Sequence, residues 1–113
     1  MPRVIKKNTP KRAIPKRFQR FLKEYPEVGK AYSALSHAVQ DAGPLDEKTR
    51  TLIKIGISAG SRQEGALHSH VRKALDAGAT PEEIRHTILQ CLPTIGFPGM
   101  MAAMSWADDI LNG

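Results

Sequence analysis

The strongest constraint on what this chain can fold into is a helix stop followed at once by a helix start. Gly78 is suited to the left-handed backbone conformation that closes many helices. Thr80, followed three residues later by Glu83, matches a capping box, and Pro81 stands where a helix needs no N–H donor. The sequence therefore predicts one helix that ends before Gly78 and a second that begins at Pro81.

A similar signal marks the start of the first of these helices. Ser61, followed three residues later by Glu64, matches another capping box and predicts a helix over 62–77. Elsewhere, apolar residues recur at helical spacing between prolines and glycines, which predicts an all-α fold of about six helices. The expected helices span residues 15–25, 26–42, 46–59, 62–77, 81–92 and 100–111, with a bend over 94–99.

One segment also fits a strand. Ile53, Ile55 and Ile57 alternate with less apolar residues at a period of two, as in a half-buried strand. Asp46 offers a helix cap just before the same segment, and the segment has the length of a helix. We favour the helix and leave the strand as the alternative.

Length and composition place the chain among globular proteins. With 113 residues it should form one domain, residues 15–113. Assembly with other subunits could readily add to the buried core of such a short chain. Its only cysteine, Cys91, excludes an intramolecular disulfide and a CxxC motif, and is expected to be inert packing in a reducing compartment. We see no membrane span and no signal peptide, and therefore expect a cytoplasmic protein.

The net charge of +6 is concentrated at one end of the chain. Residues 1–23 hold nine basic and no acidic residues, whereas the remainder holds eight basic and eleven acidic ones. Residues 1–14 also lack apolar periodicity, so we expect an extended or mobile basic arm. With few aromatic residues and no base-reading motif, such an arm suits a solvated tail or a strap on an acidic neighbouring subunit better than nucleic-acid binding.

Two histidines on the helix over 62–77 are the candidate functional residues. Residues two apart on a helix point about 200° away from each other, so His68 and His70 cannot bind one metal ion together. Each could simply be a boundary residue with a satisfied hydrogen bond. A half-buried histidine is nevertheless the natural candidate for proton transfer near neutral pH, whereas we expect Glu64 to be occupied as a cap.

Three segments resemble the carboxymuconolactone decarboxylase and alkylhydroperoxidase D family: LDEKTRTLIKIGISAG, HVRKALDAGATPEEIRHTILQ and GFPGMMAAM. The resemblance covers about residues 45–111. It implies an all-helical fold built on a helix hairpin and assembled as a homo-oligomer, usually a trimer or hexamer.

The peroxidase branch of this family carries the motif CxxCxxxH, with a glutamate on the preceding helix. When the histidine of that motif is aligned on His70, Gln63 and Ala66 fall at the cysteine positions and Thr51 falls at the glutamate. Neither glutamine nor alanine can supply a thiolate. We therefore do not expect a CxxC-dependent peroxidase.

The decarboxylase branch lacks the CxxC motif. Resemblance to it implies a carbon–carbon lyase that removes CO₂ from a small anionic substrate, such as a carboxylated lactone, with no cofactor and no metal. His70 would carry the proton, His68 would support it or bind a carboxylate, and Arg62 or Arg72 would hold the anionic groups. The alternative is a non-catalytic oligomeric binding or scaffold protein that keeps the fold without the redox cysteines.

Overall fold

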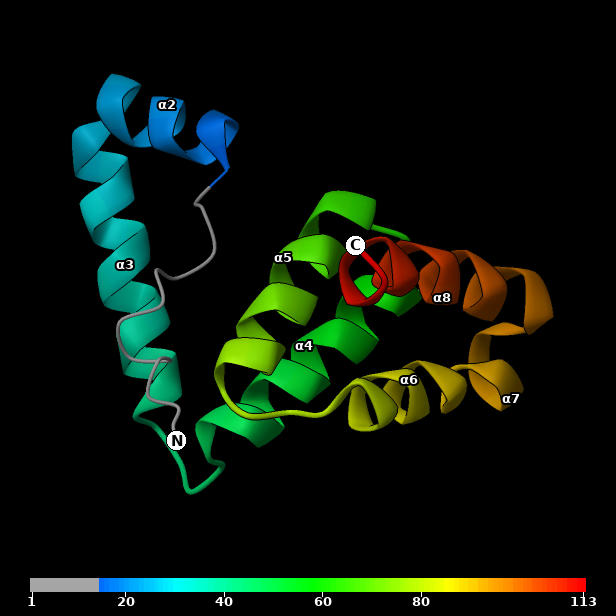
Figure 1. The fold of residues 1–113 in the computed structure, drawn as a ribbon. Helices are drawn as coiled ribbons and strands as arrows, with labels where there is room; N and C mark the ends of the chain where they lie inside the picture. Colours follow the sequence, from blue (N-terminus) through cyan, green and yellow to red (C-terminus); the bar gives the residue numbers. More distant parts are fainter. Residues whose placement is uncertain (1–14) are drawn as a thin grey trace. The chain divides into compact units, whose positions relative to one another are not determined.

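The computed structural model describes residues 15–113, and every regular element among them is a helix (Figure 1). The predicted basic arm, residues 1–14, lies outside the described residues. The all-α prediction is confirmed, and no helix of the described part has the length and hydropathy of a membrane span. The helices are α2 (Lys16–Glu24), α3 (Pro26–Gln40), α4 (Glu47–Gly60), α5 (Glu64–Asp76), α6 (Pro81–Leu89), α7 (Leu92–Ile95) and α8 (Phe97–Leu111).

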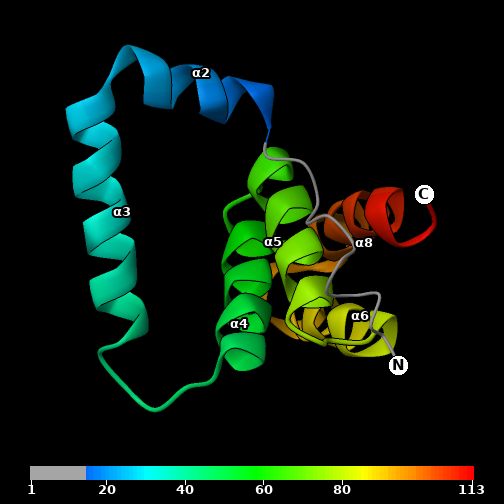
Figure 2. The same ribbon diagram turned by 60° about the vertical axis from the view of Figure 1, so that its left-hand side comes forward.

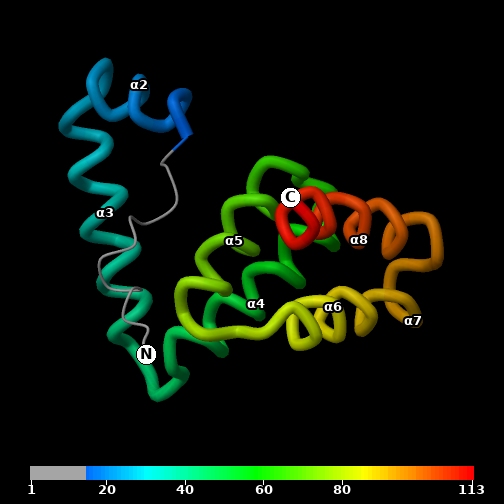
Figure 3. The backbone as a smooth tube through the Cα atoms, viewed as in Figure 1, coloured from blue at the N-terminus to red at the C-terminus, as the bar shows by residue number. Residues whose placement is uncertain are grey.

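The chain divides between Pro44 and Leu45 into two compact units. The first contains α2 and α3, joined by a sharp turn that the tube in Figure 3 follows. Gly29 lets the two helices approach closely, because a Cβ atom there would lie 2.7 Å from Cδ2 of Leu22. Gly29 is also the one buried residue of α2 and α3 taken together, so these two helices form little core between them.

One face of α3 carries apolar side chains that are open to solvent. Val28, Tyr32, Leu35 and Val39 recur at the spacing of a single helix face, and each leaves more than half of its surface exposed. We call these four residues the α3 stripe. The other side chains of α2 and α3 leave them uncovered.

The second unit is built from two helix hairpins. Helices α4 and α5 lie side by side, and α6 and α8 run next to each other across them, connected by the short helix α7 (Figure 2). The expectation of a fold built on a helix hairpin is therefore met. The apolar core lies between the hairpins, and its largest fully buried side chains are Ile55, Leu67, Val71, Ile84 and Ile88.

The segment from Ile53 to Ile57, which fits either a strand or a helix by its sequence, is part of a helix. In α4, Ile55 is fully buried, whereas Ile53 is 45% exposed and Ile57 is 62% exposed. A strand would have placed all three isoleucines on one face. On a helix, residues two apart point about 200° away from each other. Asp46 caps α4 as predicted, since its Oδ1 accepts a hydrogen bond of 2.8 Å from the N–H of Thr49.

The predicted end of one helix before Gly78 and the predicted start of the next at Pro81 are confirmed. Gly78 has a φ of 96°, and both halves of the capping box are present at the start of α6. The N–H of Glu83 donates to Oγ1 of Thr80 at 3.0 Å, and the N–H of Thr80 donates to Oε1 of Glu83 at 2.9 Å. These contacts place the end of α5 against the start of α6.

The other predicted capping box is wrong. The hydroxyl of Ser61 donates back to the carbonyl of Ile57 at 2.8 Å and so completes the end of α4. Arg62 then adopts a left-handed φ of 55°, and α5 begins only at Glu64, with Gln63 as an N-cap that makes no side-chain hydrogen bond. The carboxylate of Glu64 is therefore not a cap.

The predicted bend over 94–99 is also shorter than expected. The fifth helix ends at Leu89 rather than near residue 92, and α7 occupies Leu92–Ile95. Helix α8 begins at Phe97 rather than Met100, because Pro98 lies in its first turn, where the missing N–H costs no hydrogen bond.

Candidate functional site

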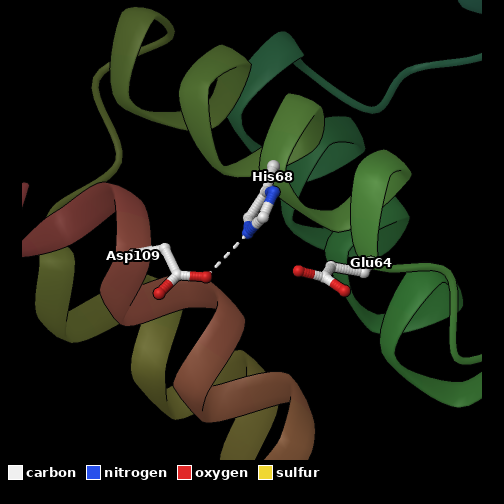
Figure 4. Close-up of side chains that lie close together, drawn as sticks. All are labelled: Glu64, His68 and Asp109. Atoms are coloured by element: carbon white, nitrogen blue, oxygen red, sulfur yellow. Dashed lines mark hydrogen bonds and ion pairs between the residues drawn. The ribbon is translucent and has the colours of Figure 1, made fainter.

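Helix α5 places the two predicted histidines on different sides, as its geometry requires. His68 faces α8, and its Nε2 lies 3.0 Å from Oδ2 of Asp109 (Figure 4). An ionised carboxylate can only accept, so the Nε2 N–H of His68 donates this hydrogen bond. The His68 side chain is 21% exposed and that of Asp109 is 57% exposed, so the pair lies at the surface between α5 and α8.

Glu64 joins this pair from one turn earlier on α5. One ligand atom each from Glu64, His68 and Asp109 lies within 4.8 Å of the others, and Figure 4 shows the Glu64 carboxylate on the same side of α5 as the His68 ring. The sequence indicates that Glu64 and His68 share a helix face. It carries no signal for Asp109, whose approach depends on how α8 packs.

His70 is half-buried and has an unused nitrogen. Its Nδ1 is shielded from solvent and makes no hydrogen bond with the described residues. Burial, together with the positive charges of Lys73 and Lys54, lowers the pKa of His70 to about 4. The ring is therefore neutral near pH 7 and offers a nitrogen that no protein group occupies.

The lowered pKa of His70 predicts acid sensitivity. The unfolded chain takes up a proton at His70 near pH 6.5, and the folded chain does so only near pH 4, so stability should fall as the pH drops through this window. Because the ring is partly solvated, we expect a loss of about 1–2 kcal/mol rather than the full value of the shift. Urea unfolding of chelator-treated protein at several pH values measures it.

The same measurement on His70→Gln provides the control, since glutamine does not titrate. Loss of stability caused by the carboxylates should appear at lower pH, because the pKa of Glu83 is lowered, first by its hydrogen bond from the Thr80 backbone. A wild-type profile that is flat between pH 6.5 and 4 would contradict the expected burial of His70.

The cations that act on His70 are not the predicted arginines. Lys73 lies on the next turn of α5 and Lys54 on α4, and both lower the pKa of His70 through their charge. The spacing of Lys73 from His70 could have indicated the first, but only the pairing of α4 with α5 brings in the second. Arg62 instead reaches the start of α8, where its Nη2 would lie 3.5 Å from a Cβ atom at Gly99. Substrate binding by Arg62 and Arg72 stays a prediction.

Two residues bear on the expected absence of a CxxC-dependent peroxidase: Thr51, at the position of the peroxidase glutamate, and Cys91, the single cysteine of the chain. Thr51 is buried, and its hydroxyl donates to carbonyls of its own helix, at 2.8 Å to that of Lys48. Burial raises the pKa of the Cys91 thiol, which favours its unreactive protonated form. Neither residue offers the acid or the thiolate of a disulfide-based peroxidase.

Comparison with known proteins shows the family of the chain. The model of the carboxymuconolactone decarboxylase family matches residues 26–109. Over 68 residues, the chain is 32% identical to a 4-carboxymuconolactone decarboxylase of Acinetobacter baylyi, covering 60% of this chain and 51% of that protein. It is also 32% identical over 68 residues to a nitrosuccinic acid decarboxylase of Metarhizium robertsii, covering 60% of this chain and 48% of that protein. The chain thus spans about half the length of these curated relatives.

A solved structure extends the match to most of the chain. The apo crystal structure of a carboxymuconolactone decarboxylase family protein from Legionella pneumophila superposes with a TM-score of 0.76 at 27% sequence identity. The superposition covers 86% of this chain and 87% of that one. Family model, relatives and structure agree, and the chain belongs to the carboxymuconolactone decarboxylase family.

Proposed function

We propose that this protein is a carbon–carbon lyase that removes CO₂ from a small carboxylated lactone or organic acid, with His70 as the proton carrier and His68 in a supporting role. The observation that carries the proposal is the shielded and unpartnered Nδ1 of His70. Two relatives named as decarboxylases support the reaction class. The single cysteine of the chain suits a cytoplasmic enzyme of this kind.

The charges around His70 suggest how a substrate would switch on its basicity. Lys54 and Lys73 lower the pKa of the empty site and would also attract a carboxylate. A bound carboxylate would offset both positive charges and raise the pKa of His70, because an opposite charge nearby favours the protonated ring. Binding of an anionic substrate would thus favour protonation of His70.

The proton is needed after CO₂ has left. When the bond between the carboxylate carbon and the neighbouring carbon breaks, its electron pair stays on that neighbouring carbon, delocalised into an adjacent carbonyl. Protonated His70 would deliver its proton to this carbon and return to the neutral state. In the balanced reaction, one substrate carboxylate and one proton are consumed, and one CO₂ and one C–H bond are formed.

The test of this function is release of CO₂ from 4-carboxymuconolactone and from nitrosuccinate by the full chain. Release above the rate in buffer, with both substrates followed by carbonate detection, would support the lyase. If neither compound releases CO₂, both are excluded as substrates of this protein. That result would also favour the alternative, a non-catalytic oligomeric binding or scaffold protein.

We also propose that the chain assembles as a homo-oligomer, a trimer or hexamer, through the α3 stripe. The stripe is apolar and exposed, and α2 and α3 bury only Gly29 between them. Apolar patches of this kind on a globular protein usually mark an interaction surface. A second copy of the chain is the occupant that the family resemblance implies.

Replacing Leu35 by aspartate should break this assembly, because a carboxylate in an apolar interface loses its hydration without gaining a partner. Light scattering should then show the mass of the particle falling toward the 12.4 kDa of one chain. Ser33→Asp, which adds the same charge to α3 about 160° away from Leu35, should leave the mass unchanged. An unchanged mass for Leu35→Asp would exclude the stripe as the interface.

A further inference from the structure

We propose that Glu64, His68 and Asp109 form a binding site for a divalent transition-metal ion, with Zn²⁺ as the ion that suits it. The site joins α5 to α8 at the protein surface (Figure 4). It does not include His70, which points to the other side of α5. It shares His68 with the proposed lyase, but binding of the ion is measured without that activity.

The geometry brings three donors to one point. Glu64 and His68 are four residues apart on α5, so their side chains lie on the same face one turn apart. Asp109 reaches them from α8, and the three ligand atoms lie within 4.8 Å of one another. Ligands of a tetrahedral zinc ion stand about 3.3–3.5 Å apart, as their bond lengths require, so a shift of about 1 Å by two exposed carboxylates closes the site.

The helices that carry these donors are held firmly. Leu67 and Val71 on α5 and Ala103 and Ala107 on α8 are fully buried in the core of the second unit. The backbone positions of the three donors are therefore fixed by packing, and only the outer ends of the side chains need to adjust. A site on such rigid elements loses little conformational freedom when it binds an ion.

The donor set fits zinc and its neighbours in the periodic table. One imidazole nitrogen and two carboxylate oxygens supply three ligands and two negative charges, and leave a fourth position for water. Imidazole favours zinc over magnesium and calcium, and the usual order of stability places manganese lowest among the first-row divalent ions and copper above zinc. His68 would give up its hydrogen bond to Asp109 and carry its ring proton on Nδ1 instead of Nε2, so that Nε2 and the Asp109 carboxylate both turn to the ion.

Neighbouring charges leave the carboxylates available. Among the described residues, neither Glu64 nor Asp109 forms an ion pair with a lysine or arginine. Arg85 of α6, which binds the residue next to Asp109, is already paired with Asp108 at 3.1 Å. Glu64 is also free because the capping box that would have used it does not form.

Titration of the chelator-treated full chain with ZnCl₂ in a calorimeter tests the site. We expect one ion per chain, with affinity weakened about tenfold or more by His68→Gln and by Glu64→Gln, since each removes a ligand. Glu64 is exposed, so its replacement should not disturb the fold, which circular dichroism checks.

The matched control uses Glu82 and His86, which have the same spacing on α6 but no third donor from another helix within the described residues. Glu82→Gln and His86→Gln should bind Zn²⁺ as the wild type does. The proposal is overturned if the wild type shows no saturable binding at millimolar Zn²⁺. It is also overturned if Glu64→Gln binds as tightly as the wild type, or if the control variants lose as much affinity as the site variants.

Discussion

Replacing Ile55 by alanine is expected to lower the free energy of unfolding by about 2–5 kcal/mol. Ile55 is fully buried on α4, inside the core between the two helix hairpins. The substitution removes apolar surface from the core and leaves a cavity that fixed neighbours such as Ile84 and Ile88 can fill only in part. Urea unfolding followed by circular dichroism measures the loss.

The same helix supplies a matched control two residues away. Ile57 is 62% exposed, so Ile57→Ala should change the free energy of unfolding by no more than about 0.5 kcal/mol. The comparison holds residue type, helix and substitution constant and varies only burial. Equal losses at the two positions would mean that α4 does not present Ile55 and Ile57 to different environments.

Replacing His70 by glutamine is expected to lower kcat for CO₂ release by about 100-fold or more, since general acid–base catalysis contributes a factor of that order. Glutamine keeps much of the shape of the ring and a polar end, but it cannot accept and return a proton. KM should change much less than kcat, because the substrate carboxylate is held by Lys54 and Lys73 in the proposed site. Steady-state kinetics with 4-carboxymuconolactone measure both constants.

His86→Gln makes the same substitution at an exposed histidine of α6 and should leave kcat unchanged. If His70→Gln retains the activity of the wild type, His70 takes no part in proton transfer. Lys54→Met adds a second readout, since it should raise KM and also raise the pKa of His70 by removing a positive charge.

Much of the fold is predictable because its signals are local. The capping box at Thr80 and the N-cap at Asp46 each depend on residues three apart, and both form as predicted. The capping box at Ser61 fails although its sequence fits, because the same hydroxyl can donate to the preceding turn of α4. Competition between two local hydrogen bonds is settled by the packing of α4 against α5, which the pattern of residues does not contain.

For the candidate site, the sequence predicts only the direction in which each side chain points from its own helix. Helix geometry alone separates His68 from His70, and the structure places them accordingly. The partners Asp109 and Lys54 come from other helices, so their approach depends on the register of tertiary packing.

The end of α8 shows what adjacent residues on a helix can achieve. Asp108 binds Arg85 of α6, and Asp109 binds His68 of α5, since neighbouring side chains point about 100° apart. One short dipeptide thereby fastens the last helix to both hairpins through two separate contacts. This redundancy means that either acid can change during evolution while the other still anchors the end of the helix, so a new function at Asp109 need not cost the fold.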